Sequence, residues 1–275
     1  MGAVAVITFN DVPLRNSTLK YERLGPLAIA NRERYCARHG YTFISSVAVD
    51  RDRPACWAKI PAVLDALETH EWVLWADSDA LIFDLDRSLE GFCAVPQDLI
   101  VQSHAAFFDL IGMPREQGLE RMPINTGVFL VRATPWSREF LRQAYAQTAY
   151  VTAGEVWDGI GEQEAMTHLI RKNPEHRRHI GYVDGLQNHP SLYRPTDLFV
   201  HFYGNHAAHL IPPNECEEVI SRWENACLRD EPFPSDRIRF HWCCIQNKTA
   251  AAVGAKGSPG HYLYRLDDVL AGAEP

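Results

Sequence analysis

Short apolar segments alternate with helix-like segments over the first 76 residues, and this order restricts the fold more than any other feature. Residues 3–9 (AVAVITF), 41–46 (YTFISS) and 72–76 (WVLWA) are short runs rich in apolar and β-branched side chains, which is typical of buried strands. Residues 17–38 and 57–69 lie between them and carry apolar side chains at helical spacing. A strand–helix–strand–helix–strand order predicts an α/β domain with a parallel sheet.

The remaining elements are less regularly spaced. Further strands are predicted at residues 99–102, 128–132 and 198–202, and further helices at residues 135–149, 161–171 and 212–228. From residue 229 onward the pattern weakens and indicates no particular element. We therefore expect one α/β domain over residues 1–228, with residues 229–275 as a C-terminal extension packed on the same domain.

Composition and charge exclude several classes of protein. Hydrophobic residues make up 46% of the 275 residues and charged residues 23%, which is typical of a globular chain. The net charge of −8 disfavours nucleic acid as a partner. No apolar stretch is long enough for an integral membrane segment, and the N-terminus lacks the pattern of a secretory signal. With seven cysteines in no regular framework, we expect a cytoplasmic protein with reduced thiols.

Two aspartates follow the apolar run 72–76 directly. Asp77 and Asp79 flank Ser78 at the carboxyl end of this predicted strand, which is the edge where open α/β sheets bind ligands. Side chains at i and i+2 of an extended segment point the same way, so both carboxylates can address one cation. Oxygen ligands suit Mg²⁺ or Mn²⁺. The alternative is an ordinary turn at the strand end, in which Asp77 caps Asp79.

The segment WVLWADSDALIFD resembles the Asp-x-Asp region of nucleotide-sugar-dependent glycosyltransferases with the GT-A fold. It is most similar to the galactosyl/mannosyl/xylosyl transferase family of yeast Golgi and plant xyloglucan enzymes. Further segments follow in that family's order: Trp57-x-Lys59-Ile60-Pro61, Asn125-Thr126-Gly127-Val128-Phe129-Leu130-Val131-Arg132 with Trp136-Ser137, Glu162-Gln163, and His201-Phe202-x-Gly204. The resemblance covers about residues 1–210 and implies a Rossmann-like, mostly parallel central sheet flanked by helices.

The resemblance also implies a metal site and a catalytic pair. Asp79 and His201 would ligate Mn²⁺ or Mg²⁺, and Asp77 would contact the metal, the ribose of the donor, or both. The alternative for His201 is a buried strand histidine with a satisfied backbone partner. Glu162 and Gln163 would lie beneath the reacting sugar, in a reaction that retains the anomeric configuration. The alternative for Glu162 is simple charge matching at a helix N-terminus.

Several other residues are predicted to bind the donor. Asn125 and Thr126 open a strand, although Asn125 is equally suited to an Asx turn. Lys59 could reach a phosphate or a sugar, or be a solvated helix residue. Ser78, Gly204 and His206 are assigned to the same site, and related plant enzymes carry a lysine at the His206 position. The nucleotide base is expected near the end of the first strand, at Thr8, Phe9, Asn10 and Arg15.

The sequence therefore predicts a metal-dependent, retaining glycosyltransferase. It would move a hexose or pentose from a UDP-linked donor to a hydroxyl-bearing acceptor, either a glycan or a small molecule. Because the chain shows no anchor, we expect a soluble, bacterial-type relative of the family. Two alternatives remain open: a metal-dependent nucleotidyltransferase or phosphohydrolase, and a non-catalytic module that binds a sugar nucleotide or a glycan.

Overall fold

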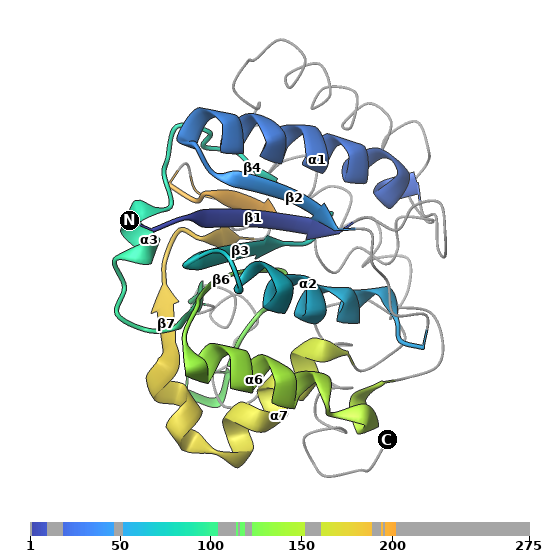
Figure 1. The fold of residues 1–275 in the computed structure, drawn as a ribbon, viewed down its shortest axis with the longest axis vertical. Helices are drawn as coiled ribbons and strands as arrows, with labels where there is room; N and C mark the ends of the chain where they lie inside the picture. Colours follow the sequence, from blue (N-terminus) through green and yellow to red (C-terminus); the bar gives the residue numbers. More distant parts are fainter. Residues whose placement is uncertain are drawn as a thin grey trace.

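The fold is taken from a computed structural model, and Figure 1 shows its elements. The structure describes residues 2–9, 19–46, 52–103, 114, 116–118, 123–151, 161–188, 194 and 196–201. The predicted helix at residues 212–228 and the predicted extension at residues 229–275 lie outside these ranges.

A six-stranded sheet forms the centre of the fold, in the order β2-β1-β3-β6-β5-β7. Its strands are β1 (Val4–Phe9), β2 (Thr42–Ser46), β3 (Trp72–Ala76), β5 (Leu99–Gln102), β6 (Val128–Arg132) and β7 (Ile180–Val183). β1 pairs in parallel with β2 and β3, and β5 pairs in parallel with β7. β6 is antiparallel to both of its neighbours, β3 and β5. The start of β6 therefore lies beside the end of β3.

Helices cover both faces of this sheet, as Figure 1 shows. The longer ones are α1 (Leu19–His39), α2 (Lys59–Ala66), α6 (Pro135–Tyr145) and α7 (Glu162–Lys172). The short ones are η1 (Ala55–Ala58), α3 (Glu90–Cys93), η2 (Thr148–Tyr150) and η3 (Pro174–His179). Among the described residues, no helix is both long enough and apolar enough to cross a membrane.

The alternating side chains of β1 divide the core into two parts. Ala5, Ile7 and Phe9 pack in one cluster with residues of α2, α6 and α7. Val4 and Val6 pack in the other cluster with residues of α1 and α3. Every residue of β1 is buried, which explains why the sequence of this strand shows an apolar run rather than an apolar–polar alternation.

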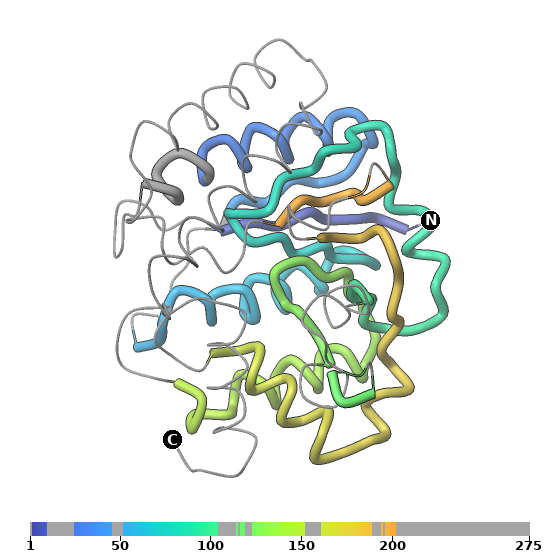
Figure 2. The backbone as a smooth tube through the Cα atoms, turned by 180° about the vertical axis from the view of Figure 1, so that it is seen from behind, coloured from blue at the N-terminus to red at the C-terminus, as the bar shows by residue number. Residues whose placement is uncertain are grey.

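A second, smaller sheet lies next to α1. It consists of β4 (Ala80–Ile82), β9 (Phe199–His201) and β8 (Gln187–Asn188), in that order. β4 is antiparallel to β9, and Ala80 lies opposite His201. Figure 2 shows the orange chain of β8 and β9 beside the teal chain of β4. The strand predicted at residues 198–202 is thus part of this second sheet.

The sequence predictions agree closely with the central elements. The strands predicted at residues 72–76, 99–102 and 128–132 have the predicted bounds. The helix predicted at residues 135–149 ends at Tyr145 and is followed by the separate turn η2. β4, β7 and β8 were not predicted. The predicted fold class, an α/β domain with a mostly parallel sheet between helices, is confirmed.

Gly40 ends α1 with a backbone conformation that favours glycine. Its φ is +69°, and a methyl group built on it would meet no atom within 4 Å. We expect Gly40→Ala to lower the free energy of unfolding by about 1 kcal/mol, because the left-handed conformation disfavours any Cβ. Urea denaturation measures this change.

Gly91 in α3 is the matched control, because it also has open space around it but no positive φ. Gly91→Ala should leave stability unchanged or raise it slightly, since alanine favours helix. Equal losses of stability in the two variants would contradict the conformational explanation.

Candidate active site

The chain turns sharply where β3 ends. The amide of Asp77 donates to the carbonyl of Gly127 at 2.7 Å and so continues the pairing between β3 and β6. The amide of Ala80 then donates to the carbonyl of Asp77 at 3.0 Å, which closes a turn over Ser78 and Asp79. Ser78 is partly exposed in this turn, whereas Asp79 is buried. The turn therefore leads from the central sheet directly into β4.

Arg32 of α1 supports this turn from behind. Its Nη2 donates to the carbonyls of Asp77 at 2.6 Å and Ala80 at 2.8 Å, and the side chain is fully buried. Burial lowers the pKa of Arg32 to about 10, and the carboxylates of Asp77 and Asp79 oppose this shift. Sequence reasoning missed Arg32. The signal available in the sequence was its helical spacing, which places Arg32 on the same face of α1 as the buried residues Leu27, Ala28, Asn31 and Tyr35.

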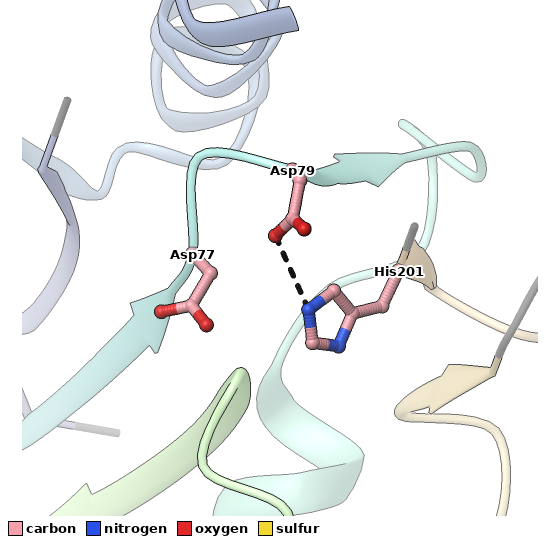
Figure 3. A group of neighbouring side chains, drawn as sticks. All are labelled: Asp77, Asp79 and His201. Carbon is pink, nitrogen blue, oxygen red and sulfur yellow. Dashed lines mark ion pairs between the residues drawn. The ribbon is translucent and has the colours of Figure 1, made fainter. Parts of the chain in front are cut away.

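Asp77, Asp79 and His201 gather in one place, as Figure 3 shows. Each offers a ligand atom, and these atoms all lie within 4.8 Å of one another. Nε2 of His201 lies 3.2 Å from Oδ1 of Asp79. Asp79 and His201 are each only 3% exposed, whereas the side chain of Asp77 is 31% exposed.

The spacing of these three groups fits a divalent cation. An octahedral ion with ligands at about 2.1 Å holds neighbouring ligand atoms about 3.0 Å apart and opposite ones about 4.2 Å apart. The separations in the group, 3.2 Å in one pair and at most 4.8 Å overall, are close to this range. The two carboxylates are ligands suited to Mn²⁺ or Mg²⁺, and a neutral imidazole is a common ligand of transition metals.

The imidazole of His201 is held by neighbours that sequence reasoning did not identify. Its Nδ1 lies 2.8 Å from Oε1 of Gln187, which is a buried side chain. The alternative interpretation of His201 as a simple buried strand histidine required a backbone partner at this position. On the other side, a Cβ added to Gly127 would overlap the imidazole ring. The missing side chain of Gly127 therefore leaves the space that the His201 ring occupies.

Lys59 of α2 lies between two of the predicted functional carboxylates. Its Nζ is 2.6 Å from Oε1 of Glu162, 3.1 Å from Oδ1 of Asp77 and 3.1 Å from the carbonyl of Thr126. The side chain is 3% exposed. All three ammonium hydrogens can thus be directed to protein oxygens, and a donor phosphate would have to displace one of them. The solvated-helix alternative for Lys59 is wrong, because the residue is buried.

The charges around Lys59 shift its own pKa and that of Asp77. Burial by itself lowers the pKa of Lys59, but the carboxylates of Asp77 and Glu162 outweigh burial and raise it above its ordinary value. Burial raises the pKa of Asp77, and the ammonium of Lys59 opposes this rise. Oδ1 of Asp77 also accepts from the indole of Trp75 at 2.7 Å.

Glu162 and Gln163 are the first two residues of α7, and both contact Thr126. Oε1 of Glu162 accepts from the Thr126 hydroxyl at 2.9 Å, and Oε1 of Gln163 accepts from the Thr126 amide at 2.9 Å. Oδ1 of Asn125 accepts from the amide of Gly127 at 2.9 Å, which is the Asx turn that the sequence left open. The predicted donor-binding residues that precede β6 and the predicted catalytic pair of α7 therefore lie in contact.

The remaining predicted residues are placed as follows. Thr8 and Phe9 end β1 at the same edge of the sheet, and both are buried. Phe9 packs in the core cluster that includes α2, so its ring is a core residue. Asn10, Arg15, Gly204 and His206 lie outside the described residues.

Comparisons with known proteins identify the group to which the chain is related. A family model described as the galactosyl transferase GMA12/MNN10 family matches residues 4–104 and 119–226. A rice protein named "Probable glycosyltransferase 6" is 35% identical over 166 residues, which cover 54% of this chain and 32% of the relative. The fission-yeast "Uncharacterized alpha-1,2-galactosyltransferase C1289.13c" is 28% identical over 64% of this chain and 55% of the relative. The chain thus spans between about a third and about half of these two relatives.

One solved structure shares the fold over most of the chain. It is described as a glycosyltransferase involved in the glycosylation of the major capsid of PBCV-1, and it aligns with a TM-score of 0.55. The alignment covers 75% of this chain and 96% of the other, at 18% identity, so the likeness concerns the fold alone. The fold likeness agrees with the predicted GT-A architecture, and the family match extends over both the turn at Asp77–Asp79 and the strand that carries His201. The chain belongs to the galactosyl transferase GMA12/MNN10 family.

Proposed function

We propose that this protein transfers a sugar from a nucleotide sugar to a hydroxyl-bearing acceptor, with a divalent cation held by Asp77, Asp79 and His201. The observation that carries the proposal is the convergence of these three side chains at the carboxyl end of β3. Membership of a galactosyl transferase family supports the same reaction class.

The cation would stabilise the negative charge that develops on the departing nucleoside diphosphate. The two carboxylates suit both Mn²⁺ and Mg²⁺, and either ion would keep open positions for diphosphate oxygens. Asp77 is the most exposed of the three ligands, so the diphosphate would approach from its side of the group. Asp79 and His201 are buried behind it and would hold the cation in place.

Glu162 is proposed as the carboxylate that faces the reacting sugar. The Lys59 ammonium and the Thr126 hydroxyl both contact Oε1, and these two contacts orient the carboxylate. A fixed negative charge there would stabilise an oxocarbenium-like transition state and favour reaction with retention. The resemblance to retaining transferases and the burial of Glu162 beside Lys59 support this assignment.

The donor base is proposed to be uracil, in keeping with the family resemblance, and to bind near the end of β1 at Thr8. The acceptor is a hydroxyl group of a glycan or a small molecule. The alternative enzyme class, a nucleotidyltransferase or phosphohydrolase, would use the same carboxylates but would release nucleoside monophosphate or phosphate.

We expect UDP with Mn²⁺ to raise the melting temperature of the protein, because a ligand bound only to the folded state stabilises it by mass action. At a ligand concentration of 100 times Kd the gain is about 2.7 kcal/mol. EDTA should abolish the gain, and so should Asp79→Asn, which keeps the size of the side chain but removes its charge. Thermal denaturation with UDP, GDP, CDP and ADP measures the effect.

Asp86→Asn is the control, since Asp86 is an exposed aspartate paired with Arg38. It should respond to UDP and Mn²⁺ as the parent does. If none of the four nucleotides stabilises the parent protein in the presence of metal, the proposed donor site is wrong.

Glu162→Gln should bind UDP and Mn²⁺ like the parent but turn over at least about 100-fold more slowly, because it loses a charge needed in the transition state. The measurement is release of UDP from a panel of UDP-sugars, with NMR of the product to determine anomeric configuration. Release of UMP or phosphate would favour the alternative enzyme class. Binding without turnover by the parent on every donor and acceptor would favour the non-catalytic alternative.

Lys59→Met should lower the free energy of unfolding by about 3–5 kcal/mol, because it leaves the buried carboxylate of Glu162 without its cation. The double variant Lys59→Met/Glu162→Gln should recover part of this loss, since the uncompensated charge is then removed. Urea denaturation compares the variants. A double variant no more stable than Lys59→Met would show that the ion pair is not the source of the loss.

A further inference from the structure

We infer that Gln187 is a positioning residue that sets the tautomer and the orientation of His201, so that Nε2 of the imidazole faces Asp77 and Asp79. Gln187 lies on β8, in the second sheet, and is 1% exposed. The inference rests on the proposed function only in taking this group of side chains to hold a cation.

The direction of the Gln187 amide follows from its acceptors. Its Nε2 lies 2.8 Å from the carbonyl of Val128 and 3.5 Å from Oδ1 of Asn125. The carbonyl oxygen of Val128 has no hydrogen to donate, and Oδ1 of Asn125 already accepts from Gly127. A reversed amide would therefore place its oxygen against two acceptors. The NH₂ group must face Val128, and Oε1 must face His201.

The protonation of the imidazole follows in turn. Oε1 of Gln187 can only accept a hydrogen bond, so Nδ1 of His201, at 2.8 Å, must carry the hydrogen. In the neutral ring this leaves the lone pair on Nε2, the atom that lies 3.2 Å from Oδ1 of Asp79. A lone pair and a carboxylate oxygen repel each other at this distance unless a cation lies between them. By accepting from Nδ1, Gln187 thus keeps the lone pair of His201 Nε2 directed toward the carboxylates, where it could bind a cation.

The surroundings of Gln187 keep this arrangement rigid. Oε1 of Gln102 accepts from the backbone amides of both Leu186 and Gln187, at 2.9 and 3.1 Å. β8 then pairs in parallel with β9, the strand that carries His201. Gly127 leaves room for the ring on its other side. The amide at one edge and the glycine at the other together restrict His201 to one orientation.

The first test needs no variant. ¹⁵N NMR of the metal-free protein, at a pH where the imidazole is neutral, reports which ring nitrogen carries the hydrogen. The signals of His201 are assigned by their absence in His201→Ala. We expect the tautomer with hydrogen on Nδ1. The tautomer with hydrogen on Nε2 would overturn the inference, whether or not the protein binds a metal.

The second test measures Mn²⁺ affinity by EPR, independently of turnover. Gln187→Met has similar length but cannot accept the hydrogen bond, and we expect it to bind Mn²⁺ about 10- to 100-fold more weakly. Asn188→Leu is the matched control, because Asn188 is the adjacent buried amide on β8 and contacts Asp197 rather than His201. It should lower the melting temperature and leave Mn²⁺ affinity unchanged.

The outcomes separate this inference from the proposed function. If the parent protein binds no Mn²⁺, the proposed metal site is wrong. The effect of Gln187 on the tautomer of His201 is then decided by the NMR measurement alone. If the parent binds Mn²⁺ and a folded Gln187→Met binds it equally well, Gln187 does not position the ligand. An equal loss of affinity in Asn188→Leu would show that the effect is a general weakening of β8.

Discussion

The ammonium group of Lys59 joins the separate parts of the candidate site. It contacts Asp77 after β3, Glu162 at the start of α7 and the carbonyl of Thr126 before β6, all at 2.6–3.1 Å. Two buried or half-buried carboxylates so close together would repel each other without a cation between them. This one charge therefore joins the first residue of α7, the proposed catalytic carboxylate, to the end of β3, while the apolar side chains of α7 pack in the core.

The reversed strand β6 brings the other residues within reach. In an all-parallel sheet the residues that precede a strand lie at the edge opposite to the ligand-binding edge. Because β6 runs antiparallel to β3, Asn125, Thr126 and Gly127 enter the sheet beside Asp77 instead. The second sheet then places His201 opposite Ala80, one residue after Asp79. Strand direction in one sheet and strand pairing in the other thus assemble the site.

Sequence reasoning could predict the parts of this arrangement that local pattern determines. The runs at residues 72–76 and 128–132 are apolar because both of their faces are buried, and their bounds follow from that. The direction of β6 was not predictable, because it depends on partners distant in the chain. β4 and β8 have three and two residues, too few for any periodicity to appear. Arg32 and Gln187 were missed because the partners that give these buried polar side chains a role come from other elements of the chain.

The pairing of Ala80 with His201 joins segments about 120 residues apart in the chain. Contacts between such distant segments are slow to form, since closing the long loop between them costs entropy before the contacts stabilise the fold. The two aspartates belong to the end of the large sheet and the histidine to the small one. A cation bound by the two aspartates and the histidine would link the two sheets to each other. Hydrogen exchange in β8 and β9 would then slow as the cation concentration rises, which would make the small sheet itself a reporter of metal binding.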